Sequence, residues 1–335
     1  MSRWKETKIL GMPLWMYLIL LAGVWTISVM EAMPGDMVGA LCFALIVGTF
    51  IGFVGDRIPV WKDWLGGGML LTCLVSGAFA TFHVLPESLI ESLNTFNGAT
   101  GFLNLYILVL VTGSVLSVNR KLLIRSFGGY IPCILSAIVC SFVLAGIVGA
   151  VVGLGPVDAV LTYAIPIMGG GNGAGCIPMS KIWGEVTGQD PQPWYATAFA
   201  ITSLGNLVAV IFGALMHRVG ELKPELTGHG ELLKLSKTEL AAEKEIKPAV
   251  GDYASGLGLG LFCFVFSGFY SSKLSIINHA GLGFTIHQFA FMIILVALLN
   301  VSGLVPDTVR AGTRGMQQFF VKYMSLPLMI TVGIG

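Results

Sequence analysis

The sequence predicts an all-α polytopic membrane protein in which one glycine-rich segment interrupts the series of spanning helices. Of the 335 residues, 55% are hydrophobic and only 11% are charged, whereas soluble domains carry about 25% charged residues. The mean hydropathy is +0.83, and the apolar runs are long enough for a helix to cross a bilayer, which takes about 17–25 residues. A transmembrane β-barrel would instead show short alternating segments. With a net charge of +1 and no basic patch, nothing indicates a nucleic-acid partner.

Nine apolar runs define the predicted spans, and a charged tail, residues 1–12, precedes them. The first run is too long for the apolar region of a signal peptide, so we expect it to remain as a helix. The last run ends with the chain. The runs cover residues 13–30, 37–54, 64–82, 102–118, 130–153, 194–216, 253–272, 284–303 and 319–335.

The segment 157–185 lies between the fifth and sixth runs and is too interrupted by proline and glycine for one straight crossing. Basic residues in the tail place the N-terminus in the cytoplasm, and residues 83–101 then form an outer loop. If the segment enters and leaves on the outer side, the charged linker 217–252 and the basic residue Arg310 lie in the cytoplasm. A full crossing would place both outside. The charge pattern therefore predicts a re-entrant hairpin.

Within this hairpin, five glycines surround Asn172: Gly169, Gly170, Gly171, Gly173 and Gly175. Helix packing alone is a poor explanation, because each glycine costs about 1 kcal/mol in a helix. A nucleotide-binding loop is also excluded, because no strand precedes the motif and no Gly-Lys-Ser/Thr ends it. Irregular backbone at membrane depth is tolerated where it lines a cavity, and transporters bind their substrates at such broken helices. The segment therefore predicts a binding site.

The two half-helices suggest which ligands this site takes. The N-terminal end of the second half-helix presents free N–H groups and a positive dipole to an anion. Carbonyl groups at the end of the first half-helix, from about Ile167 to Gly170, can ligate a hard cation such as Na⁺. The Asn172 side chain carries both a donor and an acceptor and can serve either ligand.

Four stretches of the sequence resemble the bacterial 2-hydroxycarboxylate transporter family, which includes citrate/sodium symporters and malate permeases. The resemblance runs over essentially the whole chain, and its most specific element is the Gly-Gly-Asn-Gly motif. The four stretches are Pro166-Ile-Met-Gly-Gly-Gly-Asn-Gly-Ala-Gly175, Ile177-Pro-Met-Ser-Lys181, Gly228-His-Gly-Glu-Leu-Leu-Lys234 and Ala297-Leu-Leu-Asn-Val-Ser-Gly303.

The resemblance implies a homodimeric secondary transporter rather than an enzyme, with two inverted repeats that each carry a hairpin and with one domain that moves like an elevator. Asn172 and Gly173 match hairpin positions that contact the substrate carboxylate, and Gly171 completes the expected substrate site. Ile167 and Gly170 match positions whose carbonyls hold Na⁺, and Asn172 is expected to take part there too.

The predicted organisation is a cytoplasmic tail (1–12), a first repeat region (13–216) that includes the hairpin 157–185, a cytoplasmic linker (217–252) with a short helix at 231–247, and an incomplete second repeat (253–335). The family's second hairpin and its substrate-binding arginines do not occur before the chain ends, so we expect a C-terminally truncated transporter. Arg310 and Arg314 are interpreted as topology anchors.

The expected function is symport of citrate or malate with Na⁺ across the bacterial inner membrane, with no resident cofactor or metal. The alternatives are coupling to H⁺, exchange of a dicarboxylate for lactate, and a fragment that does not transport. Among other residues, Lys181 and Glu185 are better explained by an exposed helix pair than by a gate. A position facing the hairpin and an interhelical hydrogen bond explain Asn300 equally well. Cys176, next to the motif, is expected to react with a bulky thiol reagent from the outer side.

Overall fold

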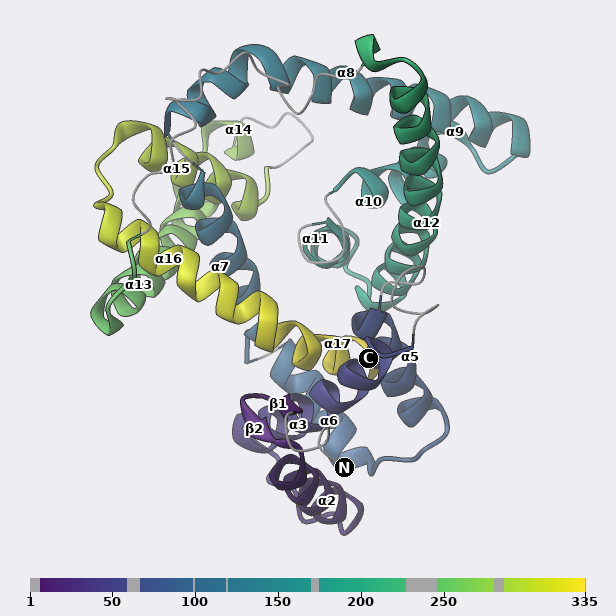
Figure 1. Ribbon diagram of the computed structural model, residues 1–335, viewed down its shortest axis with the longest axis vertical. Coiled ribbons are helices and arrows are strands. Elements are labelled where there is room, and N and C mark those ends of the chain that lie inside the picture. The colour runs from purple at the N-terminus through teal and green to yellow at the C-terminus, as the bar shows by residue number, and fades with distance from the viewer. Residues whose placement is uncertain are drawn as a thin grey trace. The chain divides into compact units, whose positions relative to one another are not determined.

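The computed structural model describes residues 7–58, 67–98, 100–118, 120–169, 175–226, 246–279 and 286–334. This part of the chain is mostly helical (Figure 1). It forms two compact units, one made of Met1–Leu110 with Gln317–Gly335 and the other of Val111–Met316.

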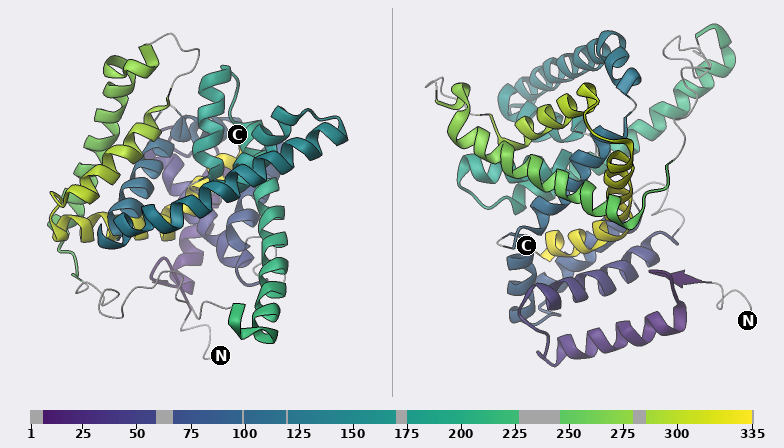
Figure 2. Two further views of the ribbon diagram at one scale, coloured as in Figure 1. Left: turned by 90° about the horizontal axis from the view of Figure 1, so that it is seen from above. Right: turned by 90° about the vertical axis from the view of Figure 1, so that its left-hand side faces the viewer.

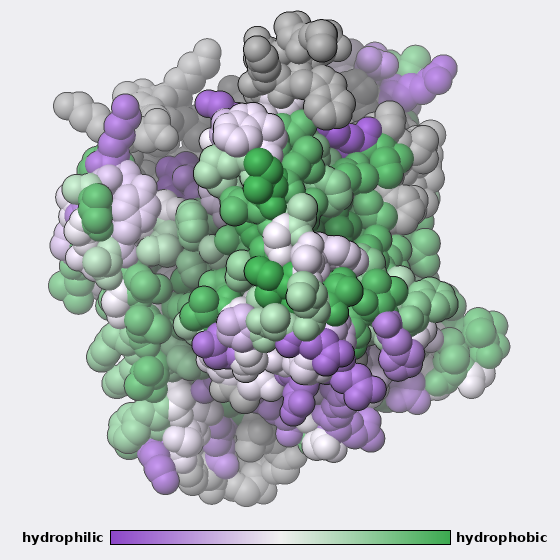
Figure 3. All heavy atoms as spheres, turned by 90° about the horizontal axis from the view of Figure 1, so that it is seen from below, coloured by the Kyte–Doolittle hydropathy of each residue, from purple (hydrophilic) through white to green (hydrophobic). Residues whose placement is uncertain are grey.

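Several of these helices have the length and composition of membrane spans, as the apolar runs predicted. Apolar side chains also cover wide areas of the face drawn in Figure 3, as expected of a surface in contact with lipid. Within the described residues, four stretches are long and apolar enough to cross: Met37–Gly55, Glu87–Ser117, Pro132–Val152 and Val250–Leu274. Shorter apolar helices are Leu14–Val29, Gly67–Thr81, Pro156–Met168 and Gln288–Ser302.

The first unit is built around its last helix, α17 (Ser325–Ile334), which packs against α3, α5 and α6. Small residues allow this close approach. A Cβ atom on Gly52 would lie only 2.6 Å from the Leu326 side chain, and a Cβ atom on Gly333 would collide with Ser76. The elements of this unit are β1 (Lys8–Ile9), β2 (Met12–Pro13), α2 (Leu14–Val29), α3 (Met37–Gly55), α5 (Gly67–Thr81), α6 (Glu87–Asn97), most of α7 (Phe102–Ser117), a π-helical turn (Phe320–Met324) and α17.

The end of the segment predicted as a cytoplasmic tail is packed structure. Strands β1 and β2 pair in antiparallel register, with Ile9 opposite Met12. Ile9 is buried in a cluster with Tyr17 and Ile46, and the Tyr17 hydroxyl donates a hydrogen bond of 2.5 Å to the Ile46 carbonyl. An apolar residue within the tail therefore fixes its last residues against α2 and α3.

The second unit contains the broken segment and the helices around it. Helices α13 and α15 pack side by side (Figure 2), and α13 crosses α16 so closely that a Cβ atom on Gly256 would lie 2.5 Å from the Thr313 nitrogen. The elements are α8 (Arg120–Val152), α9 (Pro156–Ala159), a π-helical turn (Val160–Ala164), α10 (Ile165–Met168), α11 (Ile177–Thr187), α12 (Gln192–Leu222), a 3-10 turn (Pro224–Leu226), α13 (Val250–Phe269), a second π-helical turn (Tyr270–Leu274), α14 (Ile276–His279), α15 (Gln288–Ser302) and most of α16 (Asp307–Phe319).

Two helices depart from the predicted pattern. The predicted outer loop 83–101 contains α6, and α16 occupies most of the region between the last two apolar runs. The short helix predicted at 231–247 lies largely outside the described residues. The two compact units are defined by contacts, whereas the predicted repeats, 13–216 and 253–335, are defined by internal symmetry. The division into repeats therefore stays a prediction.

Candidate functional site

The structure describes both flanks of the glycine-rich motif. The first arm, Pro156–Met168, ends in α10, and the second arm is α11 (Ile177–Thr187). The helix thus ends where the prolines and glycines predicted a break. The predicted site residues Gly170, Gly171, Asn172 and Gly173 lie between the arms and outside the described residues, so their positions stay predictions.

The two arms return to contact at the base of the motif. A Cβ atom on Gly169 would lie 2.8 Å from the Gly175 Cα atom, and one on Gly175 would lie 2.9 Å from the Gly169 carbonyl carbon. Real Cβ atoms do not approach other atoms this closely, so glycine is required at both positions. The backbone therefore leaves one arm and enters the other through a narrow neck closed by Gly169 and Gly175.

The first arm is irregular before it reaches this neck. A π-helical turn, Val160–Ala164, directly precedes Pro166, which lies in the first turn of α10. A proline ring clashes with the carbonyl group four residues earlier in a regular helix, and a π-turn widens the helix at that level. The π-helical turn before α10 therefore accommodates the ring of Pro166.

Helix α12 contacts both arms, and α10 and α11 lie on the same side of it (Figure 1). Ile167, the described member of the predicted cation site, has an exposed fraction of 43% and places its side chain 3.4 Å from a Cβ position on Gly205. On the second arm, Trp183 meets Trp194 edge to face, with ring centroids 4.7 Å apart. These contacts fix the flanks of the motif on one helix.

Cys176 is not accessible in this structure. Its exposed fraction is 0%, and its Sγ atom lies 3.1 Å from the Thr202 Oγ1 atom of α12. The expectation that a bulky thiol reagent reaches Cys176 is therefore wrong for this conformation. Cys176 directly follows the glycine-rich motif, and its thiol faces α12.

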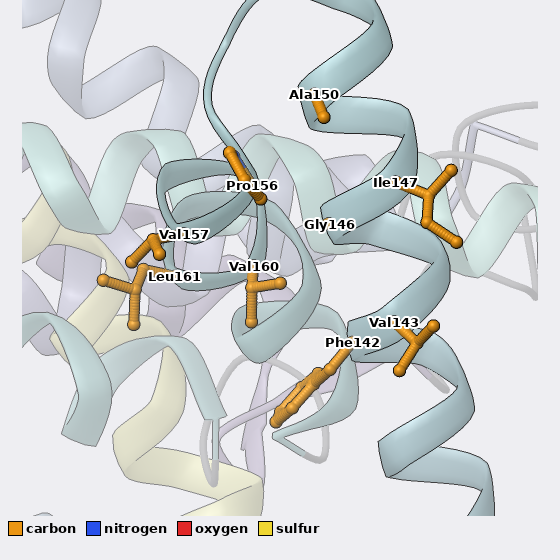
Figure 4. Close-up of a pocket in the computed structure, with 9 residues that line it drawn as sticks. All are labelled: Phe142, Val143, Gly146, Ile147, Ala150, Pro156, Val157, Val160 and Leu161. Carbon is orange, nitrogen blue, oxygen red and sulfur yellow. The ribbon is translucent and has the colours of Figure 1, made fainter.

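A cavity of about 610 Å³ lies between α8 and the first arm, but its lining is apolar. Its lining side chains come from both elements (Figure 4): Phe142, Val143, Gly146, Ile147, Ala150, Pro156, Val157, Val160 and Leu161. A carboxylate needs hydrogen-bond donors to leave water. This cavity therefore does not provide the anion site.

In the described part of the second unit, two groups of polar contacts involve charged side chains. In the first group, Glu185 lies 3.8 Å from the Lys181 Nζ atom and 2.7 Å from the His287 Nε2 atom. The Lys181 side chain is only 19% exposed and Glu185 is 47% exposed, so the prediction of a fully exposed helix pair is wrong for Lys181. His287 lies 102 residues away in sequence, and no local pattern pointed to it.

In the second group, Arg310 joins the ends of α7 and α15. Its guanidinium donates hydrogen bonds to the Leu116 carbonyl at 3.2 Å and the Val118 carbonyl at 3.0 Å, and to the Asn300 Oδ1 atom at 3.1 Å. The Asn300 Nδ2 atom also donates to the Val118 carbonyl at 3.1 Å, which is an interhelical hydrogen bond, one of the two explanations offered for Asn300. Arg310 is therefore a structural link between helices and is not free to bind substrate here.

The model of the 2-hydroxycarboxylate transporter family matches residues 9–335. The chain belongs to the 2-hydroxycarboxylate transporter family. As a member of this family it is a membrane transporter and not an enzyme, as the resemblance predicted.

Individual members of this family align with nearly the whole chain. The citrate/sodium symporter of Salmonella typhimurium is 38% identical over 330 residues, which are 98% of this chain and 73% of the relative. The citrate/sodium symporter of Klebsiella pneumoniae is 37% identical, with the same two coverages of 98% and 73%. The malate transporter MleP of Lactococcus lactis subsp. lactis is 32% identical and matches 100% of this chain and 76% of its own length.

Proposed function

We propose that this protein is a secondary transporter that carries citrate or malate with Na⁺ across the bacterial inner membrane. The observation that carries this proposal is the family match over residues 9–335 together with one α-helix that ends at Met168 and another that begins at Ile177, on either side of the Gly-Gly-Asn-Gly motif. Two relatives that are 37% and 38% identical are citrate/sodium symporters, which favours Na⁺ as the coupling ion and citrate as the first substrate to test.

The proposed ligand site is the break between the arms. Gly171, Asn172 and Gly173 bind a substrate carboxylate near the N-terminal end of α11, where the helix dipole favours an anion. The carbonyls of Ile167 and Gly170, with the Asn172 side chain, bind Na⁺. The narrow neck at Gly169 and Gly175 supports this proposal, because it holds the two helix ends next to each other.

The proposed hairpin enters and leaves on the outer side, and contacts within the second unit support this topology. The end of α7 and the end of α15 lie at the same level, since Asn300 and Arg310 both bond to the Val118 carbonyl. If α8, α12, α13 and α15 each cross once, four crossings return the chain to the side on which α7 ended. A fifth crossing by residues 157–185 would place these bonded groups on opposite sides of the membrane.

The proposal also covers the assembly and the orientation of the protein. The N-terminus lies in the cytoplasm, because the basic residues of the tail and of the linker 217–252 then share that side. The transporter works as a homodimer in which the hairpin moves with its ligands. These features rest on the charge pattern and on the family resemblance.

Uptake into proteoliposomes tests the function. With the full chain reconstituted, an inward Na⁺ gradient should drive accumulation of labelled citrate or malate, and collapse of the gradient should abolish it. Uptake that follows a pH gradient without Na⁺ would favour H⁺ symport instead, and uptake that needs internal lactate would favour exchange. Asn172→Ala should weaken substrate binding without reducing membrane insertion. If neither acid is taken up under any of these gradients, the proposed function is wrong.

A further inference from the structure

The charged cluster of Lys181, Glu185 and His287 ties the second arm to the start of α15. Both oxygens of the Glu185 carboxylate are used: Oε1 lies 3.8 Å from Lys181 and Oε2 lies 2.7 Å from His287. The two nitrogen-bearing side chains are largely buried, at 19% and 16% exposed, while Glu185 is 47% exposed. The donors Lys181 and His287 are thus largely buried, and the acceptor Glu185 is the solvent-exposed member of the cluster.

The His287 ring is oriented by its own element. Its Nδ1 atom accepts a hydrogen bond from the Phe289 N–H at 3.2 Å. In the neutral ring the proton therefore resides on Nε2, which points at Glu185. The residue before His287 is fixed as well, because the Asn278 side chain accepts from the Ile286 N–H at 2.7 Å and donates to the Ile286 carbonyl at 3.0 Å. His287 is thus a preorganised donor.

Lys181 is held in a similar way. It lies on the face of α11 that is turned toward α15, with its Nζ atom 5.8 Å from the centroid of the Phe289 ring. The same ring lies 4.8 Å from the His287 ring, centroid to centroid. One aromatic side chain therefore lies beside both donors, and both donors approach the same carboxylate, that of Glu185.

We propose that Lys181 and His287 form an additional carboxylate-binding site for the transported hydroxy acid, and that the Glu185 side chain occupies this site when substrate is absent. The inference rests on the proposed function and adds a site to it. In the proposed topology the cluster lies at the outer mouth of the hairpin. A substrate carboxylate needs hydrogen-bond donors before it leaves water, and here it replaces the carboxylate of Glu185, which swings into solvent.

A purely structural role for the cluster makes a different prediction. If the three side chains only tie α11 to α15, every substitution that breaks the tie should disturb transport in the same direction. If Glu185 competes with substrate, its neutralisation should strengthen substrate binding, while loss of either donor should weaken it. The sign of the effect therefore separates the two roles.

The test measures the KM for external citrate with the full chain in proteoliposomes at saturating Na⁺. Lys181→Met and His287→Asn should each raise KM about tenfold, the effect of losing one hydrogen bond to a charged group. Asparagine at 287 keeps a good helix N-cap but is too short to reach position 185. Glu185→Gln should lower KM about threefold, because a neutral amide competes less with a carboxylate.

Two matched variants control for a general loss of charge. Lys273→Met removes an exposed lysine in the π-helical turn that follows α13, and Asp158→Asn removes an exposed acidic residue at the start of the first arm; neither should change KM. A rise in KM for Glu185→Gln, or unchanged KM for all three cluster variants, would overturn the site while leaving transport by the wild-type chain intact. A wild-type chain without citrate uptake would overturn both the site and the proposed function. A gain of affinity in Glu185→Gln cannot arise from misfolding.

Discussion

At the scale of single residues, Arg310 shows how one side chain can donate hydrogen bonds to the unpaired carbonyl groups at the end of a helix. The last four carbonyl groups of a helix have no partner within that helix, and a cation near them is favoured by the helix dipole. Arg310 donates to two such carbonyls at the end of α7, those of Leu116 and Val118, and its Asp307 partner lies 3.5 Å away. It thereby connects α16 to both α7 and α15.

Replacement of Arg310 by methionine should destabilise the protein. The substitution removes three hydrogen bonds and leaves the carbonyls of Leu116 and Val118 without these donors. We expect a loss of about 1.5–3 kcal/mol in the free energy of unfolding, the range for hydrogen bonds to a charged group. The measurement is denaturant-induced unfolding of the purified protein in detergent micelles, followed by tryptophan fluorescence.

Two variants make this prediction specific. Arg314→Met removes the same charge four residues later on α16, where the side chain is exposed, and should change stability by less than about 0.5 kcal/mol. Arg310→Lys keeps the charge but loses the planar group that spans several acceptors, so it should remain clearly destabilised. Equal stability of the Arg310→Met and Arg314→Met proteins would refute the structural role.

At the scale of elements, the sequence predicted the apolar helices and the break more successfully than the amphipathic helices. The α-helix of the first arm ends at Met168, directly before the glycines, as expected because proline and glycine act on the local backbone. Helices α6 and α16 were missed because a search for continuous apolar runs does not detect one-sided helices. In α6 the buried residues Leu89, Leu93 and Phe96 lie four and three residues apart, which is the spacing that marks a helix face.

The contacts of the candidate site were less predictable than its backbone. The spacing of Lys181 and Glu185 indicated a helix pair, but His287 joins them from another element 102 residues away. Arg310 likewise reaches carbonyl groups 192 and 194 residues earlier in the chain. Contacts of this kind depend on how helices pack, and composition and local spacing carry no information about that.

The neck between the arms gives a prediction at this scale. Gly169→Ala should push the arms apart, because the new Cβ atom would lie 2.8 Å from the Gly175 Cα atom. Overpacking of this kind costs about 1–3 kcal/mol, so we expect citrate uptake to fall by about tenfold or more. Gly258→Ala is the matched control, since α13 has open space there. Similar uptake by the two variants would show that the neck does not position the ligand site.

At the scale of the whole molecule, a secondary transporter has to expose its ligand site to one side of the membrane at a time. A broken segment that returns to its side of entry can do this, because its free helix ends face a cavity instead of lipid. The bonds that hold Val118 to Asn300 and Arg310 support an even number of crossings between α7 and α16. The sidedness of the loops around residues 157–185 therefore decides whether the proposed mechanism is possible.

Single cysteines placed before and after residues 157–185 test that sidedness directly. In a background without the six native cysteines, Asp158→Cys and Gln189→Cys sit at exposed positions before and after the two arms, and Glu225→Cys sits at an exposed position after α12. A membrane-impermeant maleimide added to intact cells should label positions 158 and 189 but not 225, which should react only after the membrane is opened. Labelling of 158 and 225 without 189 would mean that the segment crosses the membrane, and a crossing would separate the groups that the Val118 carbonyl holds together.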